Sequence, residues 1–355
     1  MSDIKFIGLD VHKTSVAVAV LDDNGKLVMR SVLLTQASAI LAFIRGLRGT
    51  LRATFEEGTH AAWLYDLLKP HVAEVLVCDP RKNGLLKSGN KSDQIDARKL
   101  AELLRGGMLS KVYHGQNSSL TLKELGRTYT TLTADTTRVM SRLKALYRSR
   151  AISSEGKKLY TRRRREQWLA QLLQAGQRYR AQRLFEQLDG LQALRRQVRR
   201  DLLVECRKHK AAAVLTSIPY PGLIRAALLL ARVQTPFRFR GKRQFWAYCG
   251  LALETRTSAD HQLIGGELRR KTKPTSVRGL NFNHNHDLKN LFKAAATIAS
   301  AKPGPFCEFY EHLLRKGTTA EMGRLTLARK IAAITLTVWK KGERFDPEQL
   351  KPQAA

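Results

Sequence analysis

Four acidic residues are placed where their carboxylates could act together on a phosphodiester. Asp10 follows an apolar run that is typical of a buried strand, so its carboxylate is expected near the end of that strand. Glu56 closes a second run of this kind. Asp93 and Asp96 are three residues apart behind Ser92, which suits a helix N-cap, so both are expected to face one way on the first helical turn.

Divalent metal ions would allow these carboxylates to share one site. Four carboxylates repel one another unless cations lie between them, and two Mg²⁺ ions about 4 Å apart suit phosphodiester chemistry, with Mn²⁺ as the substitute. Complementing a helix dipole would explain Asp93 and Asp96, but it would not explain Asp10 or Glu56. Glu57 is the alternative to Glu56 if the strand register shifts by one residue.

The elements that must position these acids predict an α/β domain. Three strands are expected first, at residues 5–11, 14–22 and 27–34, joined by short turns. The pattern then gives a helix at 37–47, a strand at 51–56, a helix at 61–68, a strand at 74–78 and a helix at 92–105. This is the element order of a ribonuclease-H-like mixed sheet, in which the first and fourth strands are neighbours.

The middle of the chain predicts long helices. From about residue 120 to 210 the composition turns to Arg, Leu, Gln, Lys and Thr with almost no strand signal. One apolar stripe indicates an intramolecular helical hairpin or a coiled coil. Its members, spaced by three or four, are Leu184, Leu188, Leu191, Leu194 and Val198.

The last third predicts a mostly helical domain that carries a polar loop. Ile218–Gly222 interrupts the helical middle, and helices are expected at 223–233, 242–248, 288–300, 307–315 and 318–339. Residues 250–266 are predicted to be a loop that carries Ser258, and the tail after residue 345 is predicted to fray. His261 follows Ser258 by three residues, which is weak evidence for a general base. The expected divisions are 1–115, 116–212, 213–345 and 346–355.

The charge is strongly basic and unevenly distributed, which favours a nucleic-acid partner. Of a net charge of +33, residues 1–115 carry 16 Lys and Arg against 12 Asp and Glu, leaving 47 against 18 for the remainder. The first part therefore resembles a near-neutral catalytic domain, and the rest a polyanion-binding surface. The expected phosphate contacts are Arg162, Arg163, Arg164, Arg165, Arg256, Arg269, Arg270 and Lys271. For any single one of these side chains, a solvated surface position is the simpler interpretation.

Other patterns exclude several classes of protein. No apolar run approaches a membrane span and the N-terminus lacks a signal-peptide pattern, so a cytoplasmic protein without a membrane partner is expected. The four cysteines have no zinc-site or disulfide spacing and are expected to be reduced and buried. No phosphate-binding G-x-x-x-x-G-K-[ST] loop is present, so no nucleotide cofactor is expected.

Several motifs together resemble the DEDD transposases of the insertion-sequence one-ten family. The N-terminal motifs occur in order at Ile7–Lys13, Glu56–His60, Asp79–Lys82 and Lys91–Arg98. The C-terminal part is similar at Ile218–Gly222 and at Tyr248–Leu251, which precedes the family's serine loop. The resemblance covers nearly the whole chain.

The resemblance implies a RuvC-like domain, a coiled-coil region and a C-terminal serine-bearing transposase domain. It implies that Asp10, Glu56, Asp93 and Asp96 bind Mg²⁺, and that Ser258 attacks DNA to form a covalent phosphoserine link. It also implies double-stranded donor and target DNA, a structured bridge RNA as guide, and a tetramer assembled from dimers.

The serine loop departs from the family in one position. Ala259 stands where the family usually has glycine, and alanine is less free in φ, so Thr257 stays an alternative nucleophile. Two other functions stay open. A hydrolytic RuvC-like endonuclease would use the carboxylates alone, and a non-catalytic nucleic-acid binder would use neither site.

Overall fold

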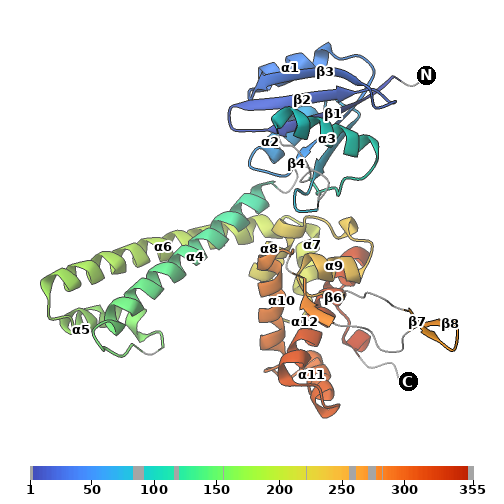
Figure 1. Ribbon diagram of the computed structural model, residues 1–355. Helices are drawn as coiled ribbons and strands as arrows, with labels where there is room; N and C mark the ends of the chain where they lie inside the picture. Colours follow the sequence, from blue (N-terminus) through green and yellow to red (C-terminus); the bar gives the residue numbers. More distant parts are fainter. Residues whose placement is uncertain are drawn as a thin grey trace. The chain divides into compact units, whose positions relative to one another are not determined.

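The computed structural model shows two compact units, formed by residues 1–116 and 117–355 (Figure 1). It describes residues 3–82, 92–115, 120–154, 156–220, 222–255, 261–270, 277–281 and 283–350. A further division of the second unit near residue 212 stays a prediction.

The first unit is built on one five-stranded mixed sheet, in the order β3-β2-β1-β4-β5. Its strands are β1 (Ile4–Val11), β2 (Ser15–Leu21), β3 (Leu27–Leu34), β4 (Thr50–Glu56) and β5 (Glu74–Cys78). The first three pair as an antiparallel meander, whereas β4 is parallel to β1 and β5 is parallel to β4. The first and fourth strands are therefore neighbours, as the sequence predicted, and the sheet is compatible with a RuvC-like fold.

Helices cover both faces of this sheet (Figure 1). The helices are α1 (Ala37–Gly46), α2 (Ala61–Leu68) and α3 (Asp93–Arg105). Ile7 and Leu9 of β1 are buried in a core with Ile40 of α1 and Leu64 of α2. Because side chains alternate along a strand, the residues between them point to the opposite face, which α3 covers. Phe6 is accordingly buried with side chains of α3.

Gly8 allows α3 to lie directly on β1. A Cβ atom at this position would overlap the carbonyl oxygen of Ala97 and would lie 2.6 Å from the backbone nitrogen of Ala101. Ala17 and Ala19 of the neighbouring β2 are buried with Ala97. Small side chains on both surfaces thus bring the helix backbone into contact with the strand backbone.

The second unit begins with two long helices that run side by side (Figure 1). These are α4 (Leu120–Arg148) and α6 (Ala175–Arg207), connected through the 3₁₀ turns η3 (Lys158–Tyr160) and η4 (Arg162–Arg164) and helix α5 (Arg165–Ala170). Their shared core includes Leu143, Tyr147, Phe185 and Leu188. The predicted apolar stripe faces this core only in part, because Leu194 is 52% exposed.

The rest of the second unit packs around one hydrophobic core. Its helices are α7 (Lys210–Thr216), α8 (Gly222–Val233), α9 (Lys242–Tyr248), α10 (His286–Ala299), α11 (Pro305–Arg315) and α12 (Ala320–Lys341), with 3₁₀ turns η5 (Pro236–Arg238) and η6 (Pro347–Leu350). Buried residues lie on several sides of α12, which is typical of a central helix.

Two sequence predictions for this unit differ from the structure. The polar loop predicted at 250–266 contains β6 (Leu253–Thr255), which pairs with β9 (Val277–Leu280), and β7 (His261–Ile264), which pairs with β8 (Glu267–Arg270). Strands this short depend on their partners more than on their own propensity. The tail also stays packed further than predicted, because Leu350 is buried in the core.

Substituting Gly8 by alanine should separate α3 from β1. Because the added methyl group would meet helix backbone, which cannot rotate away, we expect a loss of about 1–3 kcal/mol in the free energy of unfolding. Amide hydrogen exchange of α3 and urea denaturation would measure this. The matched control is Gly46→Ala at the end of α1, where a Cβ meets no described atom within 4 Å. Equal stability of both variants would contradict the assigned role of Gly8.

Candidate active site

Two carboxylates lie at the carboxyl ends of neighbouring parallel strands. Leu9 of β1 is aligned with Phe55 of β4, so the next residues along the two strands, Asp10 and Glu56, stand at the same edge of the sheet. The alternation that places Gly8 under α3 places both acids on that same face. The strand pairing therefore brings together two residues that are far apart in the sequence.

The first turn of α3 supplies the other two acids. Ser92 is the N-cap that the sequence predicted, since its Oγ accepts a hydrogen bond from the backbone nitrogen of Ile95 (3.3 Å). Asp93 and Asp96 follow on this turn, with side chains that are 61% and 33% exposed. Because α3 rests on β1 at Gly8, its N-terminal turn lies beside Asp10.

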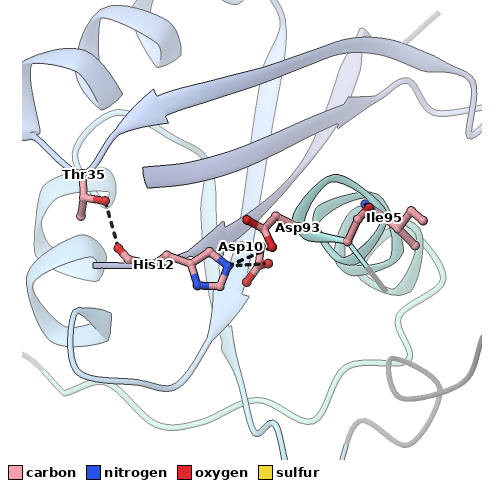
Figure 2. A network of polar contacts seen from close by, with 6 residues as sticks. Asp10, His12, Thr35, Asp93 and Ile95 are labelled. Atoms are coloured by element: carbon pink, nitrogen blue, oxygen red, sulfur yellow. Dashed lines mark hydrogen bonds and ion pairs between the residues drawn. The ribbon is translucent and has the colours of Figure 1, made fainter. Parts of the chain in front are cut away.

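His12 lies between the acids of the strand and those of the helix. Its Nε2 atom is 3.2 Å from Oδ2 of Asp10 and 3.4 Å from Oδ1 of Asp93 (Figure 2). One ligand atom from each of these three residues falls within 4.8 Å of the others. No role for His12 was predicted from the sequence. His12 is two residues from Asp10, and residues at this spacing share one face of an extended chain. This spacing could have indicated that the two side chains lie together.

The backbone of His12 is held at both of its polar groups. Its nitrogen donates to the carbonyl oxygen of Ser15 (2.9 Å), and its carbonyl oxygen accepts from Oγ1 of Thr35 (3.0 Å; Figure 2). These bonds connect the end of β1 to the start of β2 and to the end of β3. The imidazole therefore projects from an anchored turn.

The negative charges of the carboxylates in this site are only partly offset by nearby positive charge. Burial raises the pKa of Asp10, the charge and hydrogen bond of His12 lower it, and the charges of Asp93 and Asp96 raise it again, so the net pKa is raised. Among the described residues, no group forms a hydrogen bond with the buried Oδ1 atom of Asp96. Nζ of Lys99 lies 3.9 Å from that oxygen. An oxygen-rich site with an unsatisfied carboxylate oxygen fits a divalent cation.

The structure also places the alternative acid, Glu57. Its Oε2 atom is 2.7 Å from Nε2 of His114, whose ring stacks on Tyr65 of α2 at a centroid distance of 4.9 Å. Because α2 packs on the face opposite α3, Glu57 is directed away from Asp10. The register therefore favours Glu56 as the partner of Asp10.

The predicted nucleophile lies outside the described residues. Thr257, the alternative nucleophile, also lies outside them, as do Arg256 and Lys271, two of the predicted phosphate contacts. The segment that precedes these residues is hydrogen-bonded to α12. Arg329 donates from Nε to the carbonyl oxygen of Leu251 (2.6 Å).

The arginines predicted to contact phosphate are not equally free to do so. Arg165 forms two hydrogen bonds with Asp189 of α6, at 2.8 and 2.9 Å, and lies over the ring of Phe185. Arg162 lies 3.2 Å from the same carboxylate, and the bonds of both arginines lower the pKa of Asp189, those of Arg165 most. Arg163 and Arg164 are exposed, as is Arg269, which pairs with Glu267 in its own hairpin.

A basic groove that the sequence analysis missed lies at the end of α4. It has a volume of about 470 Å³ and combines cations with hydroxyl groups, which suits phosphate oxygens. Its lining residues are Lys144, Arg148, Ala151, Ile152, Ser153, Ser154 and Gly156. Lys144 and Arg148 also line an adjoining depression with Ser141 and Ser149. The serines and basic residues of the groove come from the end of α4 and from the turn that follows it. No sequence motif marks such a site.

Comparison with known protein families identifies the chain. A model of the DEDD transposases of IS110, described as transposase, matches residues 7–149, and one described as the transposase IS116/IS110/IS902 family matches residues 212–311. The chain belongs to the IS110 family of transposases. This transposase is therefore an enzyme of DNA transposition and recombination, and DNA is its partner. No curated protein sequence matches it.

The first family match contains all four acids and His12, and the second contains Ser258. Transposases of the DEDD type typically use a divalent metal ion, and the cluster of Asp10, His12 and Asp93 could hold one. Among the described residues, this cluster does not include Glu56 or Asp96. In the described part of the transposase, no helix is both long and apolar enough to cross a membrane.

The raised pKa of Asp10 predicts a stability cost in the metal-free protein. The folded transposase holds a proton on Asp10 more tightly than the unfolded chain does, so stability falls as the pH rises through the interval between the two pKa values. At neutral pH, Asp10→Asn should therefore raise the free energy of unfolding in EDTA, by about 0.5–1 kcal/mol. Thermal denaturation would measure this change.

The matched control for this variant is Asp66→Asn, which changes an exposed carboxylate of α2 and should leave the melting temperature unchanged. Added Mn²⁺ should stabilise the wild type and the control but not Asp10→Asn. A destabilised Asp10→Asn variant at pH 7 would contradict this account of the site.

Proposed function

We propose that this transposase is an RNA-guided recombinase that cuts and rejoins the DNA of a mobile element and its target. Mg²⁺ or Mn²⁺ held by Asp10, Glu56, Asp93 and Asp96 would assist the reaction, and Ser258 would form a covalent phosphoserine intermediate. The observation that carries the proposal is the convergence of strand and helix acids at one edge of the sheet, within a chain of this family.

The acids would position the scissile phosphate through a metal ion. Such an ion, when bound, supplies Lewis-acid activation and neutralises the negative charge that develops on the phosphate. The contribution of the chain is geometric: β1 and β4 hold two carboxylates on one edge, and the capped start of α3 holds the other two across from them. The side chains of Asp10 and Asp93 are 23% and 61% exposed, so a DNA backbone has access to them.

The serine would replace one DNA oxygen in the phosphodiester. Its Oγ would form a bond to phosphorus and release its proton to water, while the bond from phosphorus to one DNA oxygen would break and that oxygen would take up a proton from water, leaving as a free hydroxyl. Because the ester energy is conserved in the protein–DNA link, a DNA hydroxyl can later displace the serine without a high-energy cofactor. The absence of a nucleotide-binding loop in the sequence agrees with this scheme.

The uneven charge supports guidance by RNA. Residues 116–355 carry most of the positive charge, and the sequence contains no helix-turn-helix or zinc-finger signature that would read bases. Base pairing between a structured guide RNA and both DNA duplexes would supply that reading, while Lys144, Arg148, Arg163 and Arg164 contact backbone phosphates. Recombining two duplexes needs several strand cuts, so we expect a dimer of dimers that acts on DNA in the cytoplasm.

Replacing Ser258 by alanine tests the covalent step. The variant should lose the protein–DNA adduct by more than about 1,000-fold, because alanine has no hydroxyl group that could bond to phosphorus. Denaturing gel electrophoresis of labelled DNA would measure the adduct, and Thr257→Ala is the matched control that should keep it. If Thr257→Ala loses the adduct and Ser258→Ala keeps it, the assignment of the nucleophile is wrong.

A hydrolytic endonuclease is the second candidate, and the acidic cluster by itself favours it. Such an enzyme would cut branched DNA with the carboxylates alone and leave free 3′-hydroxyl and 5′-phosphate ends. In this case no adduct would form with the wild type, and Ser258→Ala would cut at the normal rate. If the DNA cleavage seen with the purified protein is unaffected by Asp10→Asn, the acidic site does not catalyse it, and a nucleic-acid binder without catalysis at this site is favoured.

The nucleic acid that copurifies with the protein tests guidance. When the gene is expressed with its native flanking DNA, we expect one discrete RNA, transcribed from the flank, to remain bound through purification. Sequencing of the bound RNA would identify it. A random mixture of cellular RNAs at the same salt concentration would show only charge-driven binding and would favour the unguided nuclease.

A further inference from the structure

We propose that His12 binds the metal ion directly, as a ligand in addition to the four carboxylates. An imidazole nitrogen in the site would make it select Mn²⁺ or a similar transition-metal ion over Mg²⁺. The inference rests on the proposed metal role of the acids and extends it by one residue and by the class of ion.

The distances fit one coordination sphere. Two ligand atoms bonded to the same octahedral ion at about 2.1 Å and at right angles to each other are about 3.0 Å apart. In the structure, Nε2 of His12 lies 3.2 Å from Oδ2 of Asp10 and 3.4 Å from Oδ1 of Asp93 (Figure 2). Both distances from Nε2 exceed that value by only a few tenths of an ångström, and the ligand atoms of Asp10 and Asp93 lie within 4.8 Å of each other. On the same helical turn as Asp93, the buried Oδ1 atom of Asp96 has no hydrogen-bond partner among the described residues and lies 3.9 Å from Nζ of Lys99, so it can accept a further cation.

The imidazole is anchored and accessible. Hydrogen bonds to Ser15 and from Thr35 hold the backbone of His12 on both sides, so its ring is directed toward Asp10 and Asp93 without help from the ion. The side chain is 49% exposed, which leaves a path for a hydrated ion. Ligands that are oriented before the ion binds lose little entropy on binding it.

The donor set determines which ion is preferred. Mg²⁺ prefers oxygen ligands and keeps much of its water, whereas the divalent ions of the first transition row, including Mn²⁺, bind imidazole nitrogen more readily than Mg²⁺ does. Carboxylates alone would serve Mg²⁺ well. Adding His12 to the carboxylates shifts the relative affinity toward Mn²⁺, because the nitrogen gains more from Mn²⁺ than from Mg²⁺.

A simpler arrangement would explain the same distances. The ring of His12 could only donate a hydrogen bond to Asp10 and lie near Asp93, with its nitrogen never bonded to metal. The two arrangements differ in one observable, which is the magnetic coupling between a bound Mn²⁺ ion and a histidine nitrogen.

Pulsed electron paramagnetic resonance of the full-length protein loaded with Mn²⁺ measures that coupling. We expect modulation from a directly bound ¹⁴N nucleus, which changes to the ¹⁵N pattern when the protein is labelled with ¹⁵N-histidine. The modulation should be absent in His12→Asn and present in the matched control His71→Asn, a histidine of the same unit that is outside the cluster. A wild-type spectrum without nitrogen coupling, while Mn²⁺ is bound, would overturn the proposal.

Calorimetric titration with Mn²⁺ and with Mg²⁺ gives the second measurement. His12→Asn should raise the Kd for Mn²⁺ about 10-fold and that for Mg²⁺ less than about 3-fold. Equal losses for both ions would also overturn the inference. Asp10→Asn separates this result from a failure of the proposed function. If that variant binds Mn²⁺ with the affinity of the wild type, the assignment of the metal site to the acids is wrong, independently of the role of His12. The labelled wild-type spectrum needs no variant, so a folding defect in His12→Asn leaves the test intact.

Discussion

The contact between the backbone of α3 and the backbone of β1 at Gly8 is the constraint on which the candidate site depends. A larger residue there would lift the helix from the sheet, and the first turn of α3 would carry Asp93 and Asp96 away with it. Alanines on the facing surfaces extend the same close approach along β2. The acids of the helix therefore meet those of the strands because of small residues that do no chemistry.

Alternation along the strands decides which polar groups share the site. It directs Asp10 and Glu56 to the face of α3, and Glu57 toward His114 and the opposite helices. The acids, the Ser92 cap and the adjacency of the first and fourth strands could be predicted from sequence, because each follows from a local pattern or from the element order. His12 was predicted only as part of a turn, and it lies just after β1, where its ring meets Asp10 and Asp93.

Features that depend on distant partners were not predictable in the same way. The ion pair that engages Arg165 joins residues 24 positions apart, and only the packing of the connecting segment against α6 brings them together. The four consecutive arginines look alike in sequence, yet Arg165 is bound to Asp189 while Arg163 is exposed. Likewise, β6 and β9 are too short to be recognised without their pairing. Charge predicts a polyanion partner for this part of the chain, but folding decides which side chains are free to meet it.

The charge distribution explains why a cation belongs in the chemistry of the first unit. Asp10, whose pKa is already raised by burial and by its acidic neighbours, stands where a DNA phosphate would add a further negative charge. That approach is unfavourable unless positive charge enters together with the phosphate. The arginines and lysines of residues 116–355 can concentrate DNA near the protein, but a screened surface charge does little within a cluster of carboxylates. Those carboxylates would hold a divalent ion, which would offset part of their negative charge and place positive charge directly beside the phosphate. Binding DNA and cleaving it therefore place different demands on charge, which two different parts of the chain can meet.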